Sequence, residues 1–320
     1  MQFFASLAAV PDNFGPSTVA IGKFDGVHAG HRKVIEALTT VAQSKGLVAT
    51  AVTFDRHPLA LLRPELCPEP LLSNAQKIER LSETGLDATV MLEFDKAFSE
   101  QSPEAFVESI LVDALHARVV LVGSDFRFGA KGAGTVDTLR ELGARHGFEV
   151  TLIDDVVATA TERRASSTWV RELLSTGDVA AAADLLGHLP TIRAVVVHGV
   201  QRGRELGYPT ANLAPAIEGF IPADGVYAAW FTVDGERYGA AVSIGNNPTF
   251  DGVPDKQVEA HVLDASLDLY DKSVEVSFVK FIRGMQKFSG MDALSAQMAK
   301  DEEGIRELLG YPPKGSSTES

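Results

Sequence analysis

The fold of the first half of the chain is decided by the stretch Ile21-Gly22-Lys23-Phe24-Asp25-Gly26-Val27-His28-Ala29-Gly30-His31. This stretch follows a short apolar run and opens a pattern typical of an amphipathic helix over 31–45, so it predicts a strand, a loop and a helix. Its glycines allow the backbone to approach a ligand closely, because no Cβ intervenes. The first N–H groups of a helix have no partner within the helix and attract anions, so the stretch predicts a phosphate site.

Two histidines stand at this helix start, His28 and His31. When the α-phosphorus of a nucleotide is attacked, negative charge builds on its oxygens, and imidazole donors aimed there lower the barrier. A zinc site is disfavoured because the histidines are three apart, no glutamate lies between them and no third ligand is evident nearby. Two surface histidines on an ordinary helix are the plain alternative. We expect His28 and His31 to be catalytic in nucleotidyl transfer, beside a nucleotide-binding loop of Gly22, Phe24, Asp25, Gly26 and Gly30.

Length and composition indicate a multidomain protein and exclude several classes. At 320 residues the chain is expected to hold about two domains. Its net charge of −14 would repel a phosphate backbone, so we expect no nucleic-acid partner. No apolar run reaches the roughly 18 residues of a membrane span, so no membrane partner is expected. The single cysteine, Cys67, excludes a disulfide framework and favours the reducing cytoplasm.

Strand-like runs alternate with helical patterns through the first half. The predicted strands cover 18–22, 47–54, 88–93, 118–122 and 148–153, and clear helical patterns cover 31–45 and 102–116. This alternation predicts a Rossmann-like parallel sheet covered on both faces. Ligands of such sheets bind beyond the carboxyl ends of the strands, so the loops 22–31, 54–58 and 123–129, with Asp125 in the last, should converge.

The second half changes character after residue 154. The stretch 163–171 places serine and threonine hydroxyls at a helix start between arginines, which fits either a second phosphate grip or a capped surface helix. Strands are predicted over 195–198, 226–233, 238–244, 257–263 and 274–282, followed by a helix over 291–309. We therefore expect a β-barrel with a terminal helix, and domains at 1–187 and 188–310 before a disordered tail at 311–320.

The barrel half carries its own candidate site over 199–212. Its glycines and arginines could wrap phosphates, with Gly199, Gly203, Arg204 and Gly207 as the binding residues, although no Walker A sequence occurs in the chain. Thr210 and Asn212 lie two apart, so in extended backbone their oxygens project to the same side and could hold one Mg²⁺ with substrate phosphates. An ordinary barrel turn is the plain alternative.

Together these motifs resemble the prokaryotic bifunctional riboflavin kinase and FAD synthetase family over residues 10 to 310. The family's H-x-G-H motif falls on His28 and His31. Its P-T-A-N motif falls on Pro209 to Asn212, and its general-base glutamate falls on Glu259. Its signatures Gly-Val-Tyr and Ile-Gly-x-x-Pro-Thr-Phe fall on 225–227 and 244–250. Its second adenylyl-transfer motif falls on Arg164, Ser166, Ser167, Thr168 and Arg171.

The resemblance implies two consecutive reactions. The barrel would phosphorylate riboflavin to FMN, and the first domain, a nucleotidyltransferase, would adenylylate FMN to FAD, with ATP as co-substrate and Mg²⁺ in both steps. Asp125, Arg164, Ser167, Thr168 and Arg171 would bind nucleotide or FMN. Without the resemblance, Glu259 would be taken for a solvent-facing strand residue, because apolar residues alternate with it.

Two alternatives remain open at this stage. One is a nucleotidyltransferase with a single activity and a regulatory second domain, and the other is a flavin-binding protein without catalysis. The chain also departs from the family at Arg56, where proline is common, and at Gln286, where glutamate is common, and we expect altered affinity from both. Nothing in the sequence indicates an oligomeric state.

Overall fold

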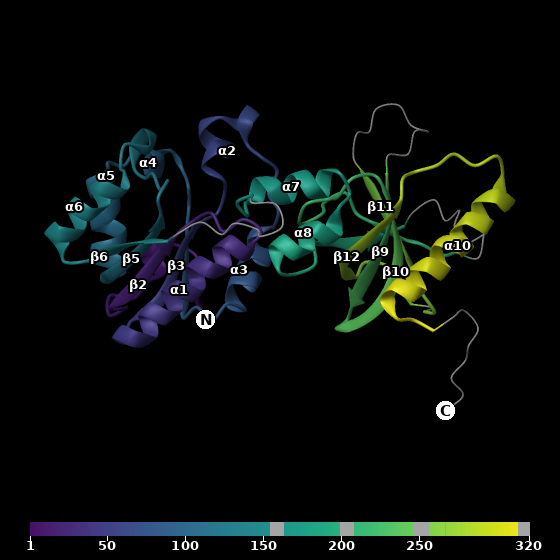
Figure 1. Ribbon diagram of the computed structural model, residues 1–320, viewed down its shortest axis with the longest axis horizontal. Helices are drawn as coiled ribbons and strands as arrows, with labels where there is room; N and C mark the ends of the chain where they lie inside the picture. The colour runs from purple at the N-terminus through teal and green to yellow at the C-terminus, as the bar shows by residue number, and fades with distance from the viewer. Residues whose placement is uncertain (154–162, 199–207, 246–255, 266, 313–320) are drawn as a thin grey trace. The chain divides into compact units, whose positions relative to one another are not determined.

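The structure is a computed structural model that describes residues 1–153, 163–198, 208–245, 256–265 and 267–312 (Figure 1). The chain divides into two compact units, Met1–Ser167 and Thr168–Ser320. None of the helices in the described ranges combines the length and the apolar character that a bilayer crossing needs.

A six-stranded parallel sheet forms the centre of the first unit. The strands lie in the order β1 (Gln2–Phe4), β4 (Ala88–Leu92), β3 (Val48–Phe54), β2 (Ser17–Ile21), β5 (Ala117–Gly123) and β6 (Glu149–Ile153). From β2 the chain builds the sheet first on one side, through β3 and β4, and then on the other, through β5 and β6. The strand order therefore reverses between β2 and β5, which is where ligands bind in sheets of this kind.

Helices and short turns connect these strands. The helices are α1 (Ala29–Lys45), α2 (Pro58–Leu62), α3 (Asn74–Ser82), α4 (Lys96–Ser99), α5 (Pro103–Phe106), the π-helical η3 (Val107–Ala114) and α6 (Val136–His146), and the 3₁₀ turns are η1 (Leu7–Ala9), η2 (Pro64–Leu66) and η4 (Ala130–Gly132). Helix α1 packs on β2 and β3 and buries Ile35, Leu38 and Ala42, which share one helical face. It ends at Gly46, whose φ of 64° suits the left-handed cap.

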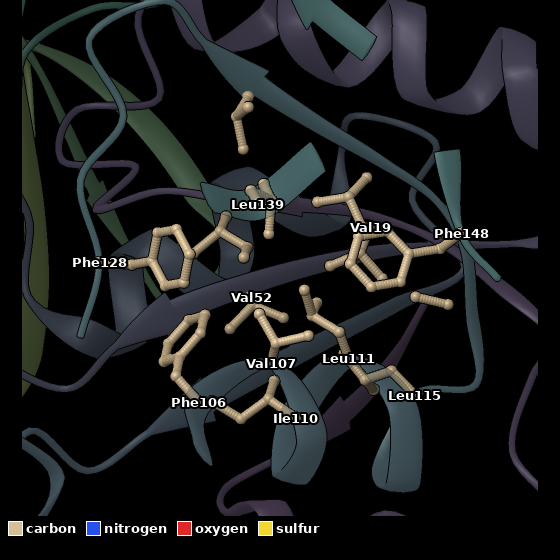
Figure 2. Packing of buried hydrophobic residues seen from close by; sticks show 14 of the residues in the cluster. Val19, Val52, Phe106, Val107, Ile110, Leu111, Leu115, Phe128, Leu139 and Phe148 are labelled. Atoms are coloured by element: carbon tan, nitrogen blue, oxygen red, sulfur yellow. The ribbon is translucent and has the colours of Figure 1, made fainter. Parts of the chain in front are cut away.

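The main core of this unit lies between the sheet and α5, η3 and α6 (Figure 2). Val19 and Val52 reach it from the central strands, and Val107 and Leu111 reach it from η3, all fully buried. Burying a side chain of this size contributes about 1.5–3 kcal/mol, so the cluster holds the central strands firmly. The loops at the carboxyl ends of those strands therefore start from fixed positions.

A closed antiparallel barrel forms the centre of the second unit. Its strands lie in the order β10 (Glu236–Gly245), β11 (Gln257–Val262), β8 (Ala211–Leu213), β7 (Thr191–Val197), β12 (Ser273–Arg283) and β9 (Gly225–Val233). Two helices precede it, α7 (Ser167–Ser175) and α8 (Val179–Leu186), and α8 packs on β12. The terminal helix α10 (Met291–Leu309) packs on β10.

Buried charges hold α10 against the barrel. Arg306, only 3% exposed, donates to the carboxylates of Asp264 and Glu302. Arg283 pairs with Asp301 in the same way at 2.8 Å. Glu302 lies on α10 itself, whereas the contacts of Arg306 with Asp264 and of Arg283 with Asp301 join the helix to the barrel and fix where the helix lies.

The fold class expected from the sequence is confirmed: a parallel α/β unit is followed by a barrel with a terminal helix. The five strands predicted in the first half are present within two residues of the expected bounds. Three strands differ. The strands β1 and β8 were not expected, because three residues give too short a pattern, and β7 begins at Thr191 instead of 195.

Along the chain, the first compact unit ends at Ser167 and the second begins at Thr168. Helices α7 and α8 belong to the barrel unit because the turn between them packs on it, and Gly177 lies against the rings of Tyr227 and Phe281. Of the predicted tail, Tyr311 accepts a hydrogen bond from the Gly239 amide at 2.8 Å. Residues 313–320 lie outside the described residues, and the boundary between the modules stays a prediction.

Candidate active sites

The loop from β2 to α1 lies at the point where the strand order reverses, and its backbone is strained. Phe24 and Val27 have φ of 48° and 42°, in the left-handed region that a branched residue such as Val27 rarely adopts. Strain of this kind costs about 1–3 kcal/mol per residue and occurs mainly at functional sites. Both side chains are buried, which leaves Lys23 and Asp25 to line the neighbouring cavity.

The two histidine rings at the start of α1 stack on each other. Their centroids are 3.7 Å apart and their planes differ by 21°. The edge of Phe24 packs on His31, with centroids 5.3 Å apart. A Cβ at Gly30 would lie 3.0 Å from Cε1 of His28, so the ring can hold this position only above a glycine. The sequence His-x-Gly-His thus builds one compact pair of imidazoles.

Both histidines are neutral at physiological pH. Burial, with a smaller contribution from the charge of Arg164, lowers the pKa of His28 to about 4. Burial also holds the pKa of His31 well below its usual value, and the charges of His28, Lys23 and Arg164 act in the same direction. A neutral imidazole carries one N–H donor and one acceptor nitrogen, so each ring can donate to a phosphate oxygen.

Several polar atoms of this motif are buried without a partner. Among the described residues, apart from Thr18 Oγ1 and Gln101 Oε1, the buried side-chain atoms that make no hydrogen bond are His28 Nδ1, His31 Nδ1 and Arg32 Nε. No side chain caps α1. Buried polar groups without partners are costly, so their clustering at a helix N-terminus indicates a site for an anion.

The second motif contacts this loop directly. The hydroxyl of Ser167 donates to the backbone carbonyl of Asp25 at 2.8 Å. The carboxylate of Asp25 accepts from the Leu71 amide at 2.9 Å. Arg164 pairs with Asp125 at 3.2 Å, although both side chains are exposed. The structure therefore brings together His28, Asp25, Ser167, Arg164 and Asp125.

A cavity of about 330 Å³ opens beside the loop, within the size range of small-molecule sites. Apolar side chains from the ends of β3 and the α2–α3 connection form much of its wall, namely Phe54, Ala60, Cys67, Pro68, Pro70 and Leu72. Its basic residues are Lys23, Arg56, His57 and Lys77. Lys77 is only 7% exposed and donates to the Phe54 carbonyl at 2.6 Å; burial lowers its pKa against the opposing charges of Asp25 and Asp55.

The barrel brings three predicted residues together. In the register of β11 against β8, Glu259 lies opposite Asn212. The Thr210 hydroxyl donates to Oε2 of Glu259 at 3.5 Å. The neighbours Val258 and Ala260 are buried, so alternation places Glu259 on the outward side of the barrel wall. A carboxylate beside a hydroxyl and an amide is suited to accept a proton from a bound alcohol.

Comparisons with known proteins identify a family for each half of the chain. Residues 11–169 match the family model of FAD synthetase, and residues 186–309 match that of riboflavin kinase. A bifunctional riboflavin kinase/FMN adenylyltransferase from Listeria monocytogenes is 38% identical over 291 residues, covering 90% of this chain and 91% of the relative. The chain belongs to this family of bifunctional flavin enzymes.

Other members of the family match over a similar length. The Escherichia coli K12 relative of the same description is 36% identical and covers 91% of this chain and 92% of its own length. A crystal structure described as a macrolide-efflux protein from Streptococcus pneumoniae has a TM-score of 0.85 and 31% identity, and covers 95% of this chain and 98% of its own. That description is of the Streptococcus pneumoniae protein alone, and the structural similarity shows that the two chains share a fold.

Some predicted residues of the family motifs belong to the second unit or lie outside the described ranges. Thr168 and Arg171 are on α7, in the second unit. Gly199, Gly203, Arg204 and Gly207 lie outside the described residues, as do residues 246–250 of the second barrel signature. The contributions of Lys23, His57 and Lys77 were missed, because nothing in a single sequence shows which polar side chains line a cavity.

Acid is expected to destabilise the first unit through His28. Its pKa is 6.5 in a model peptide and about 4 in the folded chain, so the unfolded chain binds more protons between these values. The contribution of His28 to the free energy of unfolding has its full value above pH 6.5 and falls as the pH is lowered to 4, by up to about 3 kcal/mol. Urea unfolding at a series of pH values measures this loss of stability.

The matched variant is His28→Asn, which removes the titrating group. The difference in unfolding free energy between wild type and variant should be constant above pH 6.5 and shrink towards pH 4. A difference that does not change with pH would contradict the assignment.

Proposed function

We propose that this chain adenylylates FMN at the His28–His31 site and phosphorylates riboflavin at the Thr210–Glu259 site. The two activities follow from the family: riboflavin and ATP give FMN, and FMN and ATP give FAD with release of pyrophosphate. The residue assignments are the proposal. The observation that supports it best is the neutral, stacked histidine pair whose buried nitrogens lack partners at a helix N-terminus.

Adenylyl transfer requires no base in this arrangement, because the FMN phosphate is already ionised. One of its oxygens attacks the α-phosphorus of ATP, and the bond from that phosphorus to the bridging oxygen of pyrophosphate breaks. The N–H groups of His28 and His31 and the N-terminus of α1 would stabilise the charge that develops on the phosphorus oxygens. The cavity lined by Phe54 and Leu72 supplies an apolar surface for the flavin ring.

Phosphoryl transfer has the opposite requirement. The ribityl hydroxyl of riboflavin is a poor nucleophile until its proton is removed, and the Glu259 carboxylate would accept that proton as the oxygen attacks the γ-phosphorus. The bond from that phosphorus to the bridging oxygen breaks, and ADP leaves with the electron pair of that bond. The oxygens of Thr210 and Asn212 fit Mg²⁺, which takes few protein ligands and completes its shell with phosphates and water. When bound, the ion would offset the negative charge of the ATP phosphates.

The alternatives from the sequence receive less support. A single-activity nucleotidyltransferase would not need Glu259 beside Thr210 and Asn212. A flavin-binding protein without catalysis would not need a strained loop with buried, unpartnered imidazoles. We also propose the modules 1–187 and 188–310. A cytoplasmic location and the need for Mg²⁺ stay predictions.

The test is to separate the flavins formed by the purified chain with ATP, with and without Mg²⁺, from either riboflavin or FMN. We expect FMN and then FAD from riboflavin, and FAD from supplied FMN. FMN as the only product would overturn the assignment of the first site, and no product at all would favour the binding protein.

A further inference from the structure

His261 is a histidine of the barrel for which the motifs give no role. It lies on β11, two residues after Glu259, and its ring atom Nδ1 is 2.9 Å from the carbonyl oxygen of Pro209. Strand residues two apart project to the same face, so His261 shares the outward face with Glu259. A side chain beside the proposed base therefore contacts the residue that comes directly before Thr210.

The direction of this hydrogen bond fixes where the ring carries its hydrogen. A carbonyl oxygen only accepts, so Nδ1 of His261 carries a hydrogen and donates it to Pro209. In the neutral ring, Nε2 then has none. The same ring packs edge-to-face with Tyr208, which is buried, with centroids 5.1 Å apart and planes at 67°. His261 therefore contacts both of the residues that precede Thr210.

Thr210 itself lies just before the paired part of β8. In the described part of the chain, the pairing of β8 with β11 starts at Ala211, which lies opposite Ala260. Pro209 has no N–H group and so cannot donate to a neighbouring strand. Its carbonyl belongs to the planar peptide group that it shares with Thr210, and His261 holds that carbonyl. The histidine therefore fixes the backbone from which the Thr210 hydroxyl projects.

We propose that His261 is a positioning residue of the kinase site, which keeps the Thr210 hydroxyl beside Glu259 for binding of ATP with its Mg²⁺. This inference rests on the proposed function of that site. The Thr210 hydroxyl is 3.5 Å from Oε2 of Glu259, longer than the usual distance of about 2.5–3.0 Å, so this contact holds it weakly. Asn212 instead lies within β8, paired on both sides, with β7 and with β11. Of the two proposed metal ligands, Thr210 is therefore the one that depends on His261.

The test compares His261→Leu, which lacks the donor, with wild type and with His261→Asn, whose amide donates from about the position of Nδ1. One neutral hydrogen bond corresponds to a factor of about three to ten in affinity, so KM for ATP in the kinase reaction should rise by that factor in His261→Leu. KM for riboflavin and the rate of FAD formation from supplied FMN should not change. The binding of ADP with Mg²⁺, measured by calorimetry without turnover, should weaken by the same factor. His261→Asn should retain most of the affinity.

The matched control is His188→Leu. This histidine belongs to the same unit, in the segment between α8 and β7, and its Nδ1 also contacts a backbone carbonyl, that of Leu189 at 3.0 Å. The control should leave KM for ATP unchanged. Nitrogen NMR of the wild-type side chains gives a readout that does not depend on activity, and it should show the hydrogen of the neutral His261 ring on Nδ1.

The possible outcomes separate this inference from the proposed function. An unchanged KM for ATP or unchanged ADP binding in His261→Leu would overturn the inference alone, as would a neutral ring with its hydrogen on Nε2. Equal rises in KM for ATP and for riboflavin, or an equal loss in His261→Asn, would indicate a general disturbance of the barrel and overturn it too. A wild-type chain without kinase activity would overturn both the inference and the proposed function.

Discussion

Replacing His28 with alanine is expected to lower the rate of FAD formation about 10²- to 10³-fold and to leave the riboflavin kinase rate unchanged. The loss follows from removing one donor to the phosphorus oxygens, an effect of this size in sites that stabilise a developing charge. It also leaves His31 without the ring on which it stacks at 3.7 Å. The rates of FAD and FMN formation, measured on one preparation, separate the two activities.

A matched control for this variant is His146→Ala. His146 lies in the last turn of α6 in the same unit, far along the chain from the histidine motif. It should leave both rates unchanged. If His28→Ala reduced kinase and adenylyl transfer equally in a folded chain, the assignment of separate sites would be wrong.

Replacing Glu259 with glutamine should have the opposite result. The kinase rate is expected to fall about 10²- to 10⁴-fold, because an amide of nearly the same shape cannot accept the ribityl proton. FAD formation from supplied FMN should be unaffected.

Glu236→Gln provides the control for charge. Glu236 is an exposed residue of the same barrel, at the start of β10. This variant should retain the wild-type kinase rate. A Glu259→Gln chain with a normal kinase rate would return Glu259 to the plain interpretation, a polar residue on the outside of a strand.

The central strands and the helix start after Ile21 were predictable from the sequence because these features are local. The run from Ile21 to His31 carries its own strand end, glycines and helix start, and the structure has all of them. The outward position of Glu259 was also predictable, from the apolar residues that alternate with it. In each case the residues that decide the feature lie within a few positions of one another.

Contacts between individual side chains from distant parts of the chain were not predictable in this way. The sequence predicted that the loops 22–31 and 54–58 converge, but not that Lys23 contacts His57 across 34 positions or that Lys77 reaches the Phe54 carbonyl across 23. Helices α7 and α8 belong to the barrel unit through contacts such as that of Gly177 with Phe281. A periodic pattern gives the type of an element but not its neighbour. The residues that line the cavity and the residue at which the first unit ends could therefore be found only from the structure.

The alternation in β11 has a consequence for how the kinase site is assembled. Val258, Ala260 and Val262 fill the barrel, while Glu259 faces outward between them. A slip of one residue in the pairing with β8 would expose the valines and bury the carboxylate. The hydrophobic free energy that disfavours a slipped pairing of β11 therefore also disfavours a barrel in which Glu259 points inward. A barrel that has closed correctly already carries the proposed base, Glu259, on its outward face.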